Sequence, residues 1–126
     1  MKNLILLCLM ILAATAAERQ TASMSGEVTN TTADIKAPAQ IEIFREGGKI
    51  TATLKTSPPL TGTGQLTGRC LDGWCDLSGK LDGGLVIKFR GVLNAHTFRG
   101  TYVVTPDHGP TQYGHFDFAD VLPLQK

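Results

Sequence analysis

Residues 65–81, QLTGRCLDGWCDLSGKL, contain the clearest fold signal in the chain. Apolar and polar residues alternate on both sides of Asp72-Gly73. Such a dipeptide between two alternating segments is typical of a two-residue β-hairpin turn. We therefore predict antiparallel strands over 65–70 and 74–81.

Cys70 and Cys75 flank this turn, so they would face each other across the hairpin. A zinc site would need about four ligands, and the sequence offers no second pair with metal-binding spacing. A redox couple usually has the shorter Cys-x-x-Cys spacing at the start of a helix. We favour a structural disulfide between the two strands.

The N-terminus predicts export. Lys2 precedes an apolar run over 4–14, and Ala14-Thr15-Ala16 places small residues where a signal peptidase cleaves. The alternative is that this run stays in the membrane as an uncleaved anchor. It is short for that role, because a membrane span needs about 20 apolar residues. We predict a cleaved signal peptide over 1–17 and a periplasmic or secreted protein, with bacterial export favoured. That compartment is oxidising, as the disulfide requires.

After a flexible leader expected over 18–24, residues 25–126 are predicted to form a single β domain. Further segments show strand-like patterning, separated by Gly, Pro, Asn and Asp, and no long segment has helical periodicity. These strands are expected near 26–35, 40–44, 49–56, 84–93, 97–104 and 115–121. Recurring Thr-Gly, Ser-Gly and Arg-Gly pairs predict bends in tightly curved strands.

The expected fold is all-β: about eight strands in a single antiparallel meander, most simply closed as a barrel. A two-sheet sandwich is the alternative. The strand number allows either a filled interior or room for one small ligand. The predicted inward face comprises Ile41, Ile43, Ile50, Ala52, Leu54, Leu66, Leu77, Leu81, Leu85, Ile87, Phe89, Phe98, Tyr102, Val104, Phe116 and Phe118.

This outline of consecutive hairpins resembles the calycin-type barrels, the broad class that contains lipocalins and avidins. The resemblance lies in strand number. The chain lacks the Gly-x-Trp that lipocalins carry near the first strand, because its single tryptophan is Trp74, in the middle of the chain. A shared fold does not by itself imply a shared function.

The balance of charge argues against a polyanionic partner. The chain has 12 Lys and Arg against 11 Asp and Glu, for a formal net charge of +1. Nucleic acids and anionic membrane surfaces are bound by clustered basic residues. We expect no nucleic-acid partner and no transmembrane segment after signal cleavage.

A weak metal-site candidate lies near the C-terminus. His115 and Asp117 are two residues apart on a predicted strand and so point to the same face, and His108 precedes them in a loop. The favoured interpretation is a solvated outer face, with no metal or cofactor. No serine lies in a Gly-x-Ser-x-Gly elbow. Cys8 lies in the predicted signal peptide, and Cys70 and Cys75 are assigned to the disulfide, so we predict that the protein is not an enzyme.

Trp74, Tyr113 and His108 are the candidate contact residues. Trp74 is expected to pack in the core, with a place on the barrel rim as the alternative. At the rim, it would share a binding surface with Tyr113 and His108. The loops over 57–60 and 105–114 are expected to carry contacts, because rigid scaffolds usually display function on loops.

Three functions remain open. The first is a small exported binding protein that engages another extracytoplasmic protein through barrel loops, as an inhibitor or accessory factor. The alternative is a carrier that holds a small apolar ligand in a barrel cavity. The third is a metal-dependent enzyme that uses the face of His115 and Asp117.

Overall fold

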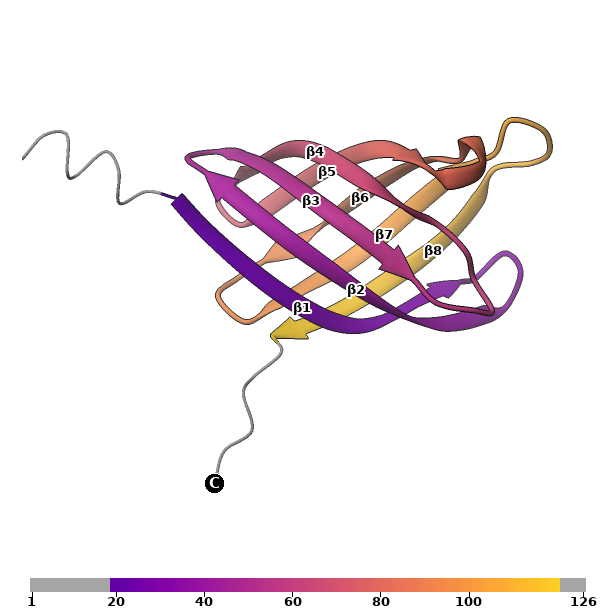
Figure 1. Ribbon diagram of the computed structural model, residues 1–126, viewed down its shortest axis with the longest axis horizontal. Helices are drawn as coiled ribbons and strands as arrows, with labels where there is room; N and C mark the ends of the chain where they lie inside the picture. Colours follow the sequence, from indigo (N-terminus) through magenta and orange to yellow (C-terminus); the bar gives the residue numbers. More distant parts are fainter. Residues whose placement is uncertain (1–18, 121–126) are drawn as a thin grey trace, which may run out of the picture.

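The computed structural model describes residues 19–120, which form a closed antiparallel β-barrel of eight strands (Figure 1). The strands are β1 (Arg19–Asn30), β2 (Ile35–Glu46), β3 (Lys49–Thr56), β4 (Thr63–Leu71), β5 (Trp74–Leu81), β6 (Val86–Leu93), β7 (Thr97–Thr105) and β8 (Gln112–Asp120), with a short 3-10 turn η1 (Asp82–Gly84). Each strand pairs with its neighbour in sequence, and β1 pairs with β8 to close the barrel. The predicted all-β meander and its closure are confirmed, and the sandwich alternative is wrong.

The barrel has two different ends. At the loop end lie the four longer connections, 31–34, 57–62, 82–85 and 106–111. At the disulfide end lie three shorter turns, together with the start of β1 and the end of β8 (Figure 1). The two loops expected to carry contacts therefore project from the same end.

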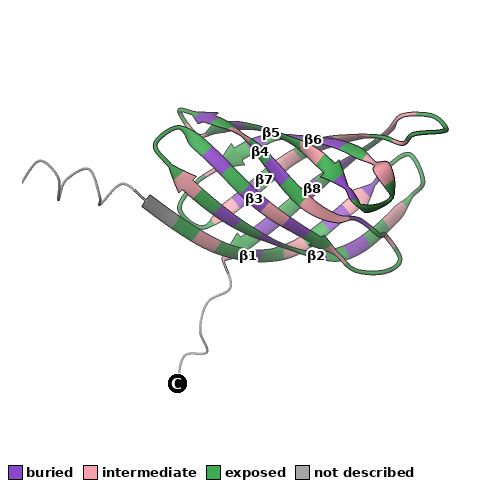
Figure 2. Ribbon diagram, turned by 45° about the horizontal axis from the view of Figure 1, so that its top comes forward, coloured by how far each residue is buried: buried purple, intermediate pink, exposed green. Residues whose placement is uncertain are grey.

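Buried and exposed residues alternate along the strands, which separates the interior of the barrel from its surface (Figure 2). The predicted inward residues are buried, except that Leu85 and Val104 are only partly buried against the core. The core also contains inward residues that we did not predict: Met24, Val28, Ala37, Ala39, Cys70 and Cys75. Polar residues occupy most outward positions, so burial of the inner face supplies the main stabilisation.

Residues 19–24 do not form the expected flexible leader, because they are the first part of β1. They pair with β2, and Met24 is buried in the core. Alternation is present here, but Thr21, Ser23 and the small Ala22 make it weakly hydrophobic. The predicted signal peptide over 1–17 lies outside the described residues.

The predicted hairpin at Asp72-Gly73 is confirmed. Both turn residues have positive φ, 52° at Asp72 and 85° at Gly73, as a type I′ turn requires. The turn aligns Cys70 directly opposite Cys75, and the predicted disulfide joins them with their Cα atoms 4.0 Å apart.

The Thr-Gly, Ser-Gly and Arg-Gly pairs do mark places where curved strands approach closely. Gly68 faces inward on β4, where a Cβ atom would overlap the backbone carbonyl of Asp76 on β5. Only a residue without a side chain allows this approach, so these glycines permit the curvature of a small barrel.

Aromatic side chains fill the centre and the disulfide end of the barrel. Phe89 stacks on Phe116 with ring centroids 4.4 Å apart, and Phe98 lies 4.7 Å from Phe116. Phe118 continues the cluster toward the disulfide end. This packing leaves the loop end as the less densely filled part of the interior.

Candidate ligand cavity at the loop end

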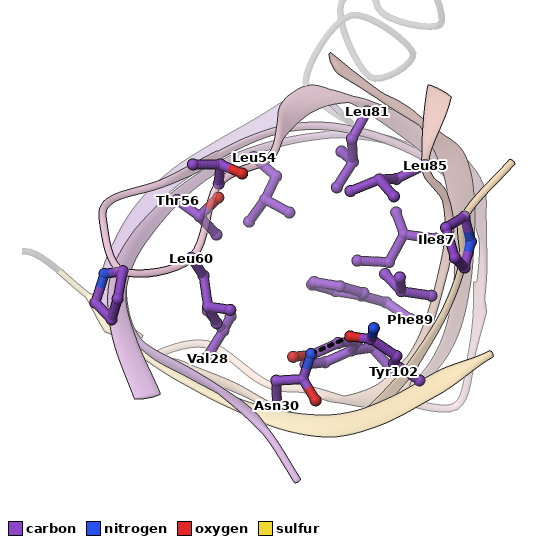
Figure 3. A pocket seen from close by; sticks show the side chains of 15 residues that line it. Val28, Asn30, Leu54, Thr56, Leu60, Leu81, Leu85, Ile87, Phe89 and Tyr102 are labelled. Atoms are coloured by element: carbon purple, nitrogen blue, oxygen red, sulfur yellow. Dashed lines mark hydrogen bonds between the residues drawn. The ribbon is translucent and has the colours of Figure 1, made fainter. Parts of the chain in front are cut away.

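A cavity of about 260 Å³ opens at the loop end of the barrel (Figure 3). Its lining comes from strands around the barrel and from the β3–β4 loop. The lining residues are Val28, Asn30, Leu54, Thr56, Pro59, Leu60, Thr61, Leu81, Leu85, Ile87, Phe89, Tyr102, Val104, Pro106 and Gln112. This volume is just below the usual range of small-molecule pockets, about 300–1,000 Å³, so it suits a small occupant.

The distribution of side-chain sizes explains the cavity. Phe89 and Tyr102 form its floor on one side, and no phenylalanine follows them toward the loop end. Inward positions at this end of the barrel are taken by Ala37, Ala39 and Gly114, which contribute little volume. The aromatic rings thus fill the centre of the barrel and leave a cavity above them at the loop end.

A pair of amides links β1 to β8 at the cavity wall. Asn30 is 6% exposed, and its Oδ1 accepts a hydrogen bond of 2.9 Å from the backbone N–H of Ala33. Its Nδ2 donates to Oε1 of Gln112 at 2.5 Å (Figure 3). Because the backbone donor fixes the orientation of Asn30, its amide nitrogen faces Gln112, which must present its oxygen.

Tyr102 contributes a further polar group to the wall. The residue is 5% exposed, and its ring lies beside Gly114, its cross-strand partner. Burial raises the pKa of the Tyr102 phenol to about 12. The phenol is therefore a neutral hydrogen-bond donor throughout the physiological pH range.

The β3–β4 loop covers part of the mouth. Leu60 reaches from this loop into the cavity opposite Ile87 and Leu85 (Figure 3). The loop is held at its base, because Thr56 donates both its backbone N–H and its hydroxyl to the carbonyl of Gly62. These hydrogen bonds close the base of the loop and so position Leu60 at its tip, where the side chain makes only apolar contacts.

The cavity wall is mostly apolar and carries no charged side chain. No Lys, Arg, His, Asp or Glu is among its lining residues within the described chain. A charged ligand would lose its hydration here without gaining a partner of opposite charge. The wall therefore favours an apolar molecule without a formal charge.

The opposite mouth has a broader hollow of about 530 Å³. Fewer residues enclose it, among them Ala22, Ile43, Leu93 and the cationic Arg45. Below it lies the phenylalanine cluster, which fills the centre of the barrel. This hollow is larger but less enclosed than the loop-end cavity, so the loop-end cavity is the better site for a small ligand.

The predicted shared rim of Trp74, His108 and Tyr113 is wrong. Trp74 lies at the disulfide end, whereas His108 and Tyr113 lie at the loop end, in the 106–111 connection and at the start of β8. Trp74 and Tyr113 both point outward and are 59% and 57% exposed. The expected core position of Trp74 is also wrong, because Cys75 faces inward and adjacent strand residues face opposite ways.

The weak metal candidates do not come together as a site. His115 and Asp117 do share the outer face of β8, as their spacing predicts. However, Oδ1 of Asp117 accepts a hydrogen bond of 2.8 Å from Nε of Arg99. Across residues 19–120, no group of three or more His, Cys, Asp or Glu side chains is arranged to hold a metal ion.

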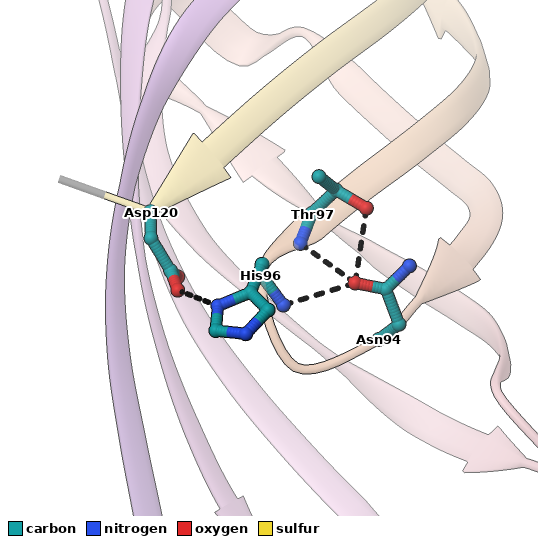
Figure 4. Close-up of polar contacts among 4 residues, drawn as sticks. All are labelled: Asn94, His96, Thr97 and Asp120. Atoms are coloured by element: carbon teal, nitrogen blue, oxygen red, sulfur yellow. Dashed lines mark hydrogen bonds and ion pairs between the residues drawn. The ribbon is translucent and has the colours of Figure 1, made fainter. Parts of the chain in front are cut away.

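A polar cluster at the disulfide end escaped the sequence analysis (Figure 4). Nδ1 of His96 lies 2.7 Å from Oδ2 of Asp120, and Oδ1 of Asn94 accepts hydrogen bonds from the backbone N–H groups of His96 and Thr97. The hydroxyl of Thr97 donates to Asn94 rather than facing the imidazole, so the cluster lacks an activated nucleophile. It fastens the β6–β7 turn to the end of β8.

No helix within residues 19–120 has the length and apolar character needed to cross a membrane. Comparison of the chain with protein-family models, curated proteins and solved structures finds no match.

Proposed function

We propose that this protein binds a small, apolar, uncharged molecule in the loop-end cavity. The observation that carries the proposal is a mostly apolar cavity at the loop end of a barrel whose centre is filled by packed aromatic rings. A carrier function was the alternative in the sequence analysis. The geometry favours it over a protein-binding rim, because the three expected rim residues do not share an end of the barrel.

The size of the cavity sets the expected affinity. Burial of about 200 Å² of apolar ligand surface would contribute roughly 5 kcal/mol at about 25 cal/mol per Å². The loss of translational and rotational freedom offsets part of that gain. We therefore expect dissociation constants of about a millimolar or weaker for simple ligands.

The proposed site of action is outside the cytoplasm. The disulfide between Cys70 and Cys75 supports this location, because such bonds persist in oxidising compartments. The apolar run at the N-terminus supports export through a signal peptide over 1–17, to the periplasm or the exterior. The proposal includes no catalytic step.

The test is a nuclear magnetic resonance titration of the purified protein with small uncharged apolar molecules. We expect shifts at Leu54, Ile87 and Val104, which line the cavity, and none at Met24 or Phe118, which lie toward the disulfide end. The variant Leu85→Trp should fill the mouth and abolish the shifts.

The matched control is Leu93→Trp, which makes the same change at the other end of the barrel. It should leave the shifts in place. Binding that survives Leu85→Trp but is lost in Leu93→Trp would contradict the proposal and assign the ligand to the hollow at the disulfide end.

A protein partner is the second candidate function, and one observation favours it. Leu71, Trp74 and Val92 are paired across β4, β5 and β6 on the outer surface and are 78%, 59% and 42% exposed. Contiguous exposed apolar residues often mark interaction surfaces. A photo-crosslinker at position 74 should capture a defined partner with an apolar surface, and one at position 113 should not.

A further inference from the structure

The Tyr102 hydroxyl has no hydrogen-bond partner among residues 19–120, although the residue is 5% exposed. No fully buried side-chain oxygen or nitrogen in that range lacks a partner. The hydroxyl must therefore border accessible space, and Tyr102 lines the loop-end cavity. A buried phenol is usually hydrogen-bonded, so the Tyr102 hydroxyl is available to donate a hydrogen bond to a ligand in the cavity.

A second donor lies on the same wall. The hydrogen bond from Asn30 uses the amide oxygen of Gln112, so the NH₂ group of Gln112 keeps its hydrogens. That NH₂ group makes no hydrogen bond to the described part of the protein. Two donors, one phenolic and one amide, are thus available on the wall where β7 and β8 meet β1.

We infer that the ligand carries one neutral hydrogen-bond acceptor of the carbonyl type on an apolar body, and that Tyr102 donates to it. This inference rests on the proposed function, because it names the chemical class that the same cavity selects. Ketones, aldehydes and esters fit it. A carboxylate does not, because the wall provides no cation to compensate for its lost hydration.

The experiment compares four probes with the same chain length: octane, octan-2-one, octan-2-ol and octanoate. Dissociation constants are measured for the wild-type chain, for Tyr102→Phe and for Tyr113→Phe. The last variant is the matched control, because it removes the same hydroxyl from an outward-facing, 57% exposed tyrosine.

The ketone should bind the wild-type chain more tightly than the other three probes. Tyr102→Phe should weaken ketone binding between about twofold and tenfold, the value of one neutral hydrogen bond, and leave octane unchanged. Tyr113→Phe should leave all four constants unchanged. Tyr102→Phe removes a group that makes no hydrogen bond within residues 19–120, so it should fold.

The infrared carbonyl band of bound octan-2-one gives a readout that does not depend on affinity. The band should lie at lower frequency in the wild-type complex than in the Tyr102→Phe complex. Equal bands in the two complexes would overturn the inference.

The outcomes separate the inference from the proposed function. If octane and octan-2-one bind equally and Tyr102→Phe changes neither, the cavity binds apolar ligands but the acceptor class is wrong. If octanoate binds most tightly, the neutral class is wrong. If no probe binds the wild-type chain, both proposals fail.

Discussion

Gly114 on β8 lies directly opposite Tyr102 on β7, and the tyrosine ring occupies the space that a side chain at position 114 would fill. A Cβ atom there would overlap both the ring and the backbone carbonyl of Thr29 on β1. The position of the phenol in the cavity thus depends on the absence of a side chain on the next strand.

Gly114→Ala should therefore lower the free energy of unfolding by about 1–3 kcal/mol, the usual cost of overpacking. It should also weaken ligand binding, because the ring of Tyr102 must move. Chemical denaturation measures the first effect, and the octan-2-one titration measures the second. Gly48→Ala is the control, because the nearest atom to its Cβ would be 3.7 Å away and no change is expected.

The pKa of Tyr102 predicts a loss of stability at high pH. Burial raises this pKa from 10.0 to about 12 in the folded state. Between these values the unfolded chain loses the proton and the folded chain keeps it, so unfolding becomes more favourable as pH rises. A shift of this size corresponds to a loss of about 2 to 3 kcal/mol across that range.

Denaturation curves collected from pH 9 to 12 measure this loss. Lysines and other groups contribute equally in all variants, so the difference between variants isolates the phenol. Tyr102→Phe should show a shallower decline than the wild type, and Tyr113→Phe should match the wild type. Identical slopes in all three proteins would refute the assignment.

The disulfide should stabilise the hairpin without being required for the fold. It closes a short loop, for which the chain-entropy model gives about 2 kcal/mol. The variant Cys70→Ala/Cys75→Ala should lose about that amount and retain the far-ultraviolet spectrum of the wild type. A reducing agent should destabilise the wild type to the same extent and leave the double variant unaffected. If the double variant is unfolded, the disulfide is essential for the fold and the prediction is wrong.

Trp74 should report on the outer surface and not on the cavity. Its indole is 59% exposed at the disulfide end, so acrylamide should quench its emission efficiently, and ligand binding should leave that emission unchanged. Trp74→Ser should change the free energy of unfolding by less than about 1 kcal/mol.

Phe116→Ala should lower the free energy of unfolding by about 3–5 kcal/mol, because that ring is at the centre of the packed cluster. Chemical denaturation measures both effects.

Local sequence signals predicted the hairpins well. Asp72-Gly73 determines the register of β4 and β5. Alternate residues of a strand face the same side, so inward Leu77 and Leu81 imply that Cys75 faces inward and Trp74 outward. This alternation can be read from the sequence alone. The general burial of tryptophan predicts a core position for Trp74, and the alternation of the strand overrides that tendency here.

The sequence allows a cavity, but its position and lining could not be predicted, because they depend on which residues lie at the same level along the axis of the closed barrel. Asn30, Tyr102 and Gly114 meet only through the pairing of β1 with β8 and of β8 with β7. The closing pair joins the two ends of the sequence, and its stagger is set by the packing of the whole interior. Side-chain spacing within one segment contains no information about that stagger.

The start of β1 and the end of β8 both lie at the disulfide end, away from the cavity. A fusion partner, an affinity tag or a sensor surface joined at either point would therefore leave the ligand entrance facing the medium. The barrel can be immobilised in a known orientation through either strand. This geometry suits the protein to surface-based assays that test the proposed binding of small neutral carbonyl compounds.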